Sequence, residues 1–248
     1  MRLKEELKSL LIEEVRAWRG KTAYREPILR VASVSDPMWL ELKRVFPAHF
    51  MPKELLDDAQ SVIVFFLPFV EDIIRSNQGG YYSSKDWAVA YVETNELLAK
   101  IAGKMVSLLE GRGFRGISVK PTHNFDEVKL ISSWSHRHVG FIAGMGTFGV
   151  NNMLITEKGC GGRLNSVITS AILEPDERPR YDYCLYKRGR TCDSCVRKCP
   201  VSALRLDGFD RFKCYEHCLE VDAYFKDMPT TDICGKCITY PCALTIPD

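Results

Sequence analysis

The hydrophobic positions of the first 175 residues form two long helical stripes and several short apolar runs. Residues 3–18 and residues 85–111 repeat apolar side chains every three to four positions, which predicts two amphipathic helices. Residues 61–69 (SVIVFFLPF) are short, β-branched and aromatic, as in a buried strand. Further strands are predicted at 117–119, 153–156 and 166–173. A Pro- and Gly-punctuated stretch, which contains Pro27, Pro37, Pro47 and Pro52, follows the first helix.

These elements predict an α+β fold in two parts. Long helices interspersed with short strands suggest a layered α+β domain over residues 1–175. The segment from Pro175 to Arg180 is charged and bracketed by prolines, so it is the predicted linker. Residues 176–248 then form a second, smaller domain.

A glycine-rich segment follows a helical approach within residues 136–150. The run FIAGMGTFGV places Gly144, Gly146 and Gly149 in a tight loop, and Asn151 comes directly after it. Glycine lets the backbone approach a flat cofactor closely, which a Cβ atom would prevent. The alternative is a tight turn between helix and strand without a ligand, and the spacing alone leaves both interpretations open.

Composition and charge exclude several classes of protein. The chain is 46% hydrophobic and 27% charged with a formal net charge of +2, which is typical of a globular protein and gives no electrostatic case for a dedicated nucleic-acid binder. Its longest apolar run, residues 62–67, is too short to span a bilayer. The charged N-terminus does not resemble a signal peptide. We therefore expect a cytoplasmic protein without a membrane partner.

Cysteine usage is the most informative feature. The chain has ten cysteines, and only Cys160 lies before residue 184. The cytoplasm does not favour disulfides, and a disulfide framework would normally extend over a whole small domain. Clustering in one short segment therefore indicates metal binding.

The spacing of these cysteines predicts a ferredoxin-like domain with two [4Fe–4S] clusters. Two Cys-x2-Cys pairs are each accompanied by more distant cysteines, as in two-cluster ferredoxins, where the last cysteine of each run ligates the other cluster. The predicted ligands of one cluster are Cys184, Cys192, Cys195 and Cys242, and those of the other are Cys199, Cys214, Cys234 and Cys237.

Two alternatives remain open for the metal. Cys218 lies one helical turn after Cys214 and could replace it as a ligand; we prefer Cys214 because it leads the segment. Zinc is the other alternative, because the two Cys-x2-Cys pairs by themselves would make a four-thiolate structural site. Zinc would leave Cys184, Cys199, Cys214 and Cys242 without a role.

The segment AGMGTFGVNNMLIT (Ala143 to Thr156), together with the downstream cysteine array, resembles the epoxyqueuosine reductase family. The resemblance implies a nitroreductase-like layered domain that binds cobalamin base-off beside one cluster, with Gly144, Gly146, Gly149 and Asn151 as cofactor-binding residues. It also implies that electrons pass through both clusters to the corrinoid. Reductive dehalogenases share this design, so the substrate does not follow from the architecture.

The sequence departs from the family at two places. The family's catalytic aspartate lies in an Asp-x-x-Pro segment, but residues 130–136 contain neither aspartate nor proline. His136, with Ser135 beside it, is the candidate proton donor in its place, and a surface or capping histidine is the alternative. The family's C-terminal helical repeats do not follow Cys242 within the 248 residues, so we expect a small-molecule substrate and not tRNA.

A basic run flanks the first cluster ligands and suggests a partner. It comprises Arg178, Arg180, Lys187, Arg188 and Arg190. Such a run could dock an acidic low-potential electron donor of the flavodoxin or ferredoxin type, or be solvated surface. The function we expect is an iron–sulfur oxidoreductase that passes electrons to a corrinoid or similar cofactor, a flavin included. A non-enzymatic electron-transfer or cluster-binding partner protein is the alternative.

Overall fold

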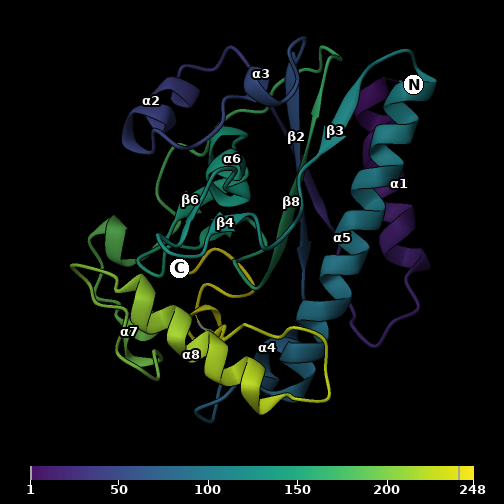
Figure 1. The fold of residues 1–248 in the computed structure, drawn as a ribbon. Helices are drawn as coiled ribbons and strands as arrows, with labels where there is room; N and C mark the ends of the chain where they lie inside the picture. Colours follow the sequence, from purple (N-terminus) through teal and green to yellow (C-terminus); the bar gives the residue numbers. More distant parts are fainter. Residues whose placement is uncertain (1, 240) are drawn as a thin grey trace.

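A four-stranded antiparallel sheet forms the centre of the N-terminal part (Figure 1). The computed structural model describes residues 2–239 and 241–248. The strands lie in the order β1-β2-β8-β3, with bounds Ile28–Ser33, Ser61–Pro68, Gly162–Thr169 and Gly116–Ser118. This arrangement confirms the predicted α+β class.

Strand β2 is buried along its whole length because both faces of the sheet are covered. Ile63, Phe65 and Leu67 point into one hydrophobic cluster. Val64 and Phe66, which alternate with them, point into the other. A strand covered on both faces needs apolar residues at consecutive positions, which explains its unbroken apolar run.

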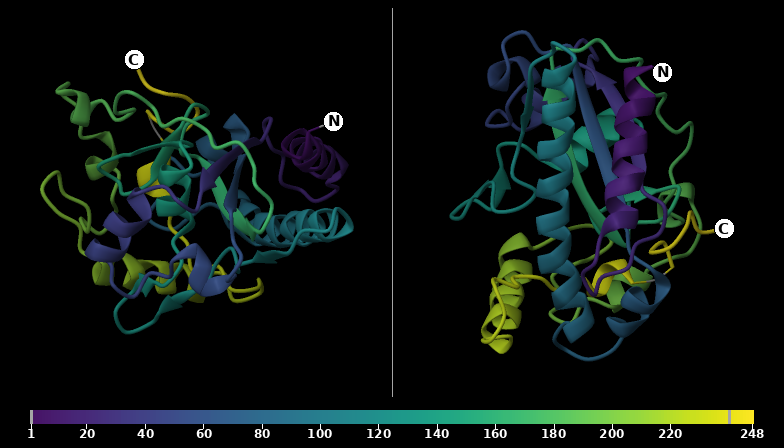
Figure 2. Two further views of the ribbon diagram at one scale, coloured as in Figure 1. Left: turned by 90° about the horizontal axis from the view of Figure 1, so that it is seen from above. Right: turned by 90° about the vertical axis from the view of Figure 1, so that its right-hand side faces the viewer.

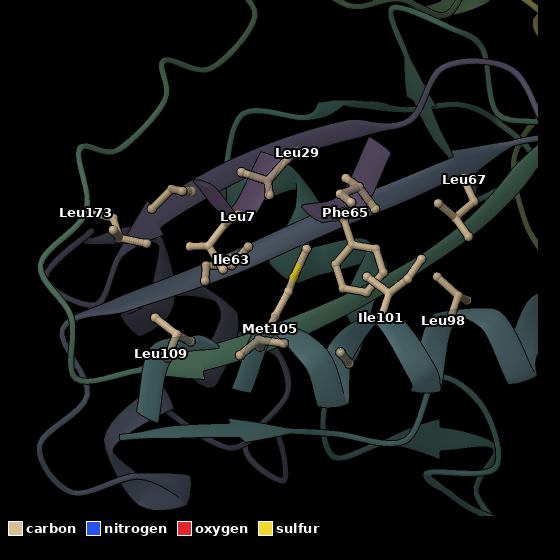
Figure 3. Packing of buried hydrophobic residues seen from close by; sticks show 14 of the residues in the cluster. Leu7, Leu29, Ile63, Phe65, Leu67, Leu98, Ile101, Met105, Leu109 and Leu173 are labelled. Atoms are coloured by element: carbon tan, nitrogen blue, oxygen red, sulfur yellow. The ribbon is translucent and has the colours of Figure 1, made fainter. Parts of the chain in front are cut away.

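Two antiparallel helices, α1 (Leu3–Ala17) and α5 (Lys85–Gly111), cover one face of the sheet (Figure 2). Their apolar stripes supply Leu7, Leu98 and Met105 to the cluster beneath them (Figure 3). Ser84 is the N-cap of α5, and its hydroxyl accepts a hydrogen bond from the backbone N–H of Trp87. Packing against the sheet therefore secures the two helices that the sequence pattern predicted.

The opposite face carries shorter elements. They are the helices α2 (Met38–Val45), α3 (Pro52–Leu55) and α6 (His136–Ile142), and the hairpins β4–β5 (Phe125–Asp126, Ile131–Ser132) and β6–β7 (Gly146–Phe148, Leu154–Thr156). Trp39 and Trp134 stack there with ring centroids 5.8 Å apart. Residues of α6 and of the two hairpins line the cavities described below, together with residues of the sheet.

The C-terminal segment lies across one end of the sheet, beside α4 (Glu71–Ser76) (Figure 1). Its elements are η1 (Tyr186–Arg188), α7 (Ser194–Arg197), α8 (Arg211–Tyr224) and η2 (Lys236–Ile238). The N–H of Cys160 donates to the carbonyl of Cys242 at 2.8 Å, and the N–H of Gly161 donates to that of Ala243 at 2.9 Å. Both parts thus contribute to one hydrophobic cluster, and the division at residue 175 stays a prediction.

The structure confirms the two long helices and the buried strand, and it differs from the sequence prediction elsewhere. The strand expected at 166–173 runs over Gly162–Thr169, because its first half pairs with the end of β2. β1 falls in the Pro- and Gly-punctuated stretch, for which the sequence predicted no strand. Its six residues are a strand because each pairs with β2. None of the described helices combines the length and apolar character needed to cross a bilayer.

Candidate functional site

Four cysteines from the C-terminal segment line one cavity, which we call the first thiol cavity. They are Cys184, Cys192, Cys195 and Cys242, the same four that the spacing grouped together. Burial, and then the neighbouring Cys242 thiol, raises the pKa of Cys195 to about 11. A thiol with such a pKa stays protonated at neutral pH unless a bound metal removes its proton.

Five further cysteines line the second thiol cavity, which has a volume of about 230 Å³. They are Cys199, Cys214, Cys218, Cys234 and Cys237. Burial raises the pKa of Cys237, and it raises that of Cys234 to about 11. The walls between these thiols are mostly apolar, including Val201, Leu204 and Ile238.

Helix α8 turns three donor side chains toward the second thiol cavity: Cys214, His217 and Cys218. The sequence reasoning missed His217, although it lies between the two cysteines in KCYEHC. Its Nε2 is buried and has no hydrogen-bond partner among the described residues, and its Nδ1 lies 3.3 Å from Glu220 Oε2. Because Cys214 and Cys218 line the same cavity, the choice between them stays a prediction.

The donor chemistry fits two four-iron clusters. The two Cys-x2-Cys pairs line different cavities, so the placement does not support a single zinc ion held by those four thiols. Within the described residues, no three or more His, Cys, Asp or Glu side chains lie close enough together to hold a single metal ion. Each thiol cavity offers at least the four thiolates that a [4Fe–4S] cluster needs.

Asn151 and Cys160 lie between the cavities. Asn151 lines both thiol cavities, and its Nδ2 donates to the carbonyl of Cys237 at 3.0 Å. Cys160 is buried with its Sγ 3.7 Å from that of Cys242. It also lines the central cavity described next, so it stands between the first thiol cavity and that space.

A third space, the central cavity, has a volume of about 370 Å³ and lies next to the second thiol cavity. The two share Met153, Gly162 and Arg163 in their walls. An outer cavity of about 390 Å³ adjoins it through Leu130, Ser132, Ser135 and Arg137. Polar groups and aromatic rings alternate around the central cavity, which is the usual composition of a small-molecule site.

The glycine loop does not line the central cavity. Gly144 has φ +75°, and a Cβ there would lie 2.3 Å from the carbonyl oxygen of Glu177. A Cβ at Gly146 would lie 1.9 Å from the carbonyl oxygen of Ile155 in the paired strand β7. The close approach that requires glycine at these two positions is made by this chain's own backbone, and only Gly149 lines a cavity, the first thiol cavity. A cofactor role for Gly144 and Gly146 therefore lacks geometric support.

His136 lines the central cavity, but both of its ring nitrogens are engaged by protein. Nε2–H donates to the carbonyl of Lys120 at 2.9 Å, and Nδ1 lies 2.9 Å from the hydroxyl of Ser166. Because the carbonyl only accepts, Nδ1 is the acceptor for Ser166, and the neutral tautomer is defined. Burial lowers the pKa of His136 to about 4. This environment corrects the expectation of a proton donor active near pH 7.

The neutral state of His136 predicts acid lability. Its folded pKa lies below the ordinary value of 6.5, so the unfolded chain binds more protons between pH 6.5 and 4. The free energy of unfolding should fall by about 3 kcal/mol from this group as pH drops through that window. The change to test is His136→Gln, which removes the titration. Denaturant unfolding at pH 7 and 5 should show a smaller loss for the variant, and an equal loss would contradict the assignment.

Ser135, the second predicted catalytic residue, lies at the boundary between the central and outer cavities. Its N–H donates to Nε2 of His49 at 3.0 Å, and its hydroxyl lies 2.8 Å from Nδ1 of His138. Burial lowers the pKa of His138 to about 4, so this imidazole is neutral as well. Ser135 is therefore placed to contact a ligand, but its histidine neighbours are not charged acids.

A second set of hydrogen-bonded polar side chains lies beside the central cavity and comes from three segments that are distant in the sequence: Tyr91, Thr122 and Asp232. The Tyr91 hydroxyl donates to Asp232 Oδ1 at 2.7 Å and lies 3.2 Å from Thr122 Oγ1. Thr122 lines the central cavity, and Asp232 lines the second thiol cavity. Burial raises the pKa of Tyr91 to about 12, so the phenol keeps its proton. From the sequence, Tyr91 could either face a pocket or be a core tyrosine with a satisfied hydroxyl, and the core position was preferred.

Two of the five residues of the basic run near the first thiol cavity interact with other groups of the protein. Arg178 pairs with Asp36 at 2.6 Å, and Arg188 donates to the carbonyl of Pro247. Arg180, Lys187 and Arg190 are exposed. The exposed charges therefore lie on the segment that also supplies Cys184 and Cys192.

Comparison with known proteins gives matches among solved structures only. No family model matches the chain, and no curated protein matches it. An epoxyqueuosine reductase from Streptococcus thermophilus has a TM-score of 0.60 at 18% identity, with 100% of this chain and 68% of that chain covered. An epoxyqueuosine reductase solved with a stem loop of tyrosine tRNA has a TM-score of 0.55 at 20% identity, covering 88% and 58%. A variant of a catabolic reductive dehalogenase has a TM-score of 0.59 at 16% identity, covering 95% and 35%.

These similarities concern the fold. They confirm the resemblance that the glycine loop and the cysteine array indicated, since structures of epoxyqueuosine reductases share this arrangement of helices and sheet over nearly the whole chain. One of these structures is a complex with a tRNA stem loop.

Proposed function

From a fold shared with epoxyqueuosine reductases and reductive dehalogenases, we propose that this protein is an iron–sulfur oxidoreductase. It takes single electrons from an external donor, passes them through two [4Fe–4S] clusters, and reduces a small substrate at a corrinoid in the central cavity. The observation that carries the proposal is the placement of two cysteine-lined cavities beside a polar cavity, one of which shares three wall residues with it.

Different residues of the chain would hold the two clusters and the corrinoid. Cys184, Cys192, Cys195 and Cys242 would hold one cluster, and Cys199, Cys214, Cys234 and Cys237 the other. The central and outer cavities adjoin, so together they suit a ligand as broad as a corrin ring. When bound, a corrinoid supplies a low-potential cobalt centre for substrate reduction. Asn124, Ser132 and Ser135 line this space and would hydrogen-bond to the amide groups at the edge of the ring.

The proton needed for reduction has a candidate source in Tyr91. No aspartate or glutamate is among the described residues that line the central cavity, and His136 has no free nitrogen. The Tyr91 phenol keeps its proton at neutral pH and connects to the cavity through Thr122 at 3.2 Å. Asp232 accepts from the same hydroxyl and orients it.

An acidic electron donor would dock on the exposed basic residues beside the first thiol cavity. Arg180, Lys187 and Arg190 give this face a positive charge, and Cys192 is only half-buried there. A short path from the surface to the first cluster follows from this placement. The ten cysteines are all free thiols in the structure, which suits the reducing cytoplasm that we propose as its location.

Two rival functions depend on the same cavities. A non-enzymatic electron carrier would have no need of the central cavity, whose presence favours an enzyme. A tRNA substrate is suggested by the stem-loop complex of one structure with this fold, and a tRNA-binding assay addresses it directly.

Anaerobic reconstitution followed by cobalamin titration tests the proposal. The protein should contain about eight iron and eight sulfide per chain, as two cubanes require. Cob(II)alamin should then bind at micromolar concentration and give the electron paramagnetic resonance signal of the base-off form. Tight binding of a flavin instead of cobalamin would indicate a nitroreductase-like flavoprotein, and binding of neither would favour the carrier. One zinc without labile sulfide would overturn the cluster assignment.

A further inference from the structure

Arg163 is a half-buried guanidinium without a matching acid. It lies near the start of β8 and lines both the central cavity and the second thiol cavity. Its Nε is enclosed and has no hydrogen-bond partner among the residues that the structure describes. Its guanidinium carbon lies 4.3 Å from the centre of the Tyr91 ring, which keeps the side chain extended toward the cavities.

The central cavity around Arg163 is positive. Its charged lining consists of Arg163 and Arg137, and no aspartate or glutamate among the described residues lines it. Arg137 already donates from Nη1 to the carbonyl of Asn152 at 2.6 Å. Arg163 is thus the guanidinium of this cavity whose N–H donors are available to a ligand. An unpaired charge removed from water is costly, so a ligand that supplies the opposite charge is strongly favoured.

The nearby carboxylate of Asp232 does not satisfy Arg163. Its Oδ1 accepts from Tyr91 at 2.7 Å and lies 3.5 Å from His123 Nε2. No ion pair joins Asp232 to Arg163 within 4.0 Å among the described residues. Asp232 lines the second thiol cavity and is not among the residues that line the central cavity.

We propose that Arg163 binds an anionic group, a carboxylate or a phosphate ester, on the molecule that occupies the central cavity. This inference rests on the proposed function only in taking that cavity as the ligand site. Phe125 and Trp134 line the same cavity, so the rest of the ligand has a flat or apolar surface. The anionic group belongs either to the substrate or to the phosphodiester in the nucleotide tail of a corrinoid.

Two matched pairs of probes separate these sources, with calorimetric titration of anaerobic, cluster-loaded protein. Benzoate and benzamide have the same size and differ in charge. Cobalamin and cobinamide share the corrin ring, and only cobalamin carries the tail phosphodiester. Each pair is measured with the wild type, with Arg163→Gln, with the charge-conserving Arg163→Lys, and with the exposed control Arg190→Gln.

A substrate carboxylate predicts that wild type binds benzoate at least about tenfold tighter than benzamide, and that Arg163→Gln removes the preference. A tail phosphodiester predicts the same pattern for cobalamin over cobinamide. Arg163→Lys should keep part of the preference, and Arg190→Gln all of it. If neither pair shows a preference that depends on Arg163, the proposal is wrong. A benzoate preference in a protein that binds no corrinoid would support the anion site and count against the proposed function.

Discussion

Replacing Cys237 with serine is expected to lower the iron content of the anaerobically reconstituted protein from about eight to about four per chain. Cys237 is half-buried among the thiols of the second thiol cavity, and desolvation, followed by the neighbouring Cys234 thiol, raises its pKa. A serine hydroxyl is a far weaker iron ligand than a thiolate. Iron and sulfide analysis together with the absorption spectrum measures the loss.

Cys192→Ser is the matched change in the first thiol cavity and should remove the other four irons. Loss of either cluster should also loosen the C-terminal segment, because metal binding contributes folding energy to a segment with so little regular structure. Limited proteolysis of the two variants would detect this loosening as new cleavage after residue 176.

Cys160→Ser is the control. Cys160 is buried 3.7 Å from the Cys242 thiol, but eight other thiols suffice for two clusters, so iron content should be unchanged. Cys218→Ser should likewise retain both clusters if Cys214 is the ligand. Full iron content in Cys237→Ser and Cys192→Ser would refute the ligand assignment.

Gly146→Val should prevent folding of the protein, whether or not a cofactor is present. A Cβ at Gly146 would lie 1.9 Å from the carbonyl oxygen of Ile155. The atoms that the added Cβ would meet belong to the backbone of β7, so the clash cannot be relieved by the rotation of a side chain. Strands β6 and β7 would have to move apart. We expect a loss of several kcal/mol of unfolding free energy, on the order of 4 or more, seen as insoluble protein or a lost thermal transition.

Gly103→Ala is the matched control within the same chain. Gly103 is exposed in the middle of α5, and a Cβ there would meet no atom within 4 Å. Alanine should stabilise the helix by up to about 1 kcal/mol. A soluble Gly146→Val protein with an unchanged melting temperature would show that the hairpin is packed differently from this description.

The elements that were predictable from sequence are those whose pattern is local. The apolar stripe of Lys85–Gly111 has helical period over its whole length, and the structure places the helix at those residues. The run that became β2 is apolar at every position because both of its faces are covered. The grouping of the eight cysteine ligands was also inferred from spacing, by analogy with two-cluster ferredoxins, and it stays a prediction.

Tertiary structure decided what the same residues do when distant segments meet. The glycines of the loop were open to two interpretations, and the carbonyl of Ile155 explains why Gly146 must lack a side chain. His136 looked like a titrating acid until burial and two hydrogen bonds fixed it as a neutral base.

Three residues meet at the cavity, and the sequence indicated only that one of them, Tyr91, could face a pocket. Tyr91, Asp232 and Arg163 come from a helix, a loop and a strand separated by tens of residues, and they meet only in the folded chain. Periodicity reports which face of an element is buried, because that depends on neighbours three or four positions away. Which side chains share a cavity, and whether a buried charge finds a partner, depends on contacts between remote segments and therefore becomes defined only when the sheet, α5 and the cysteine segment pack together.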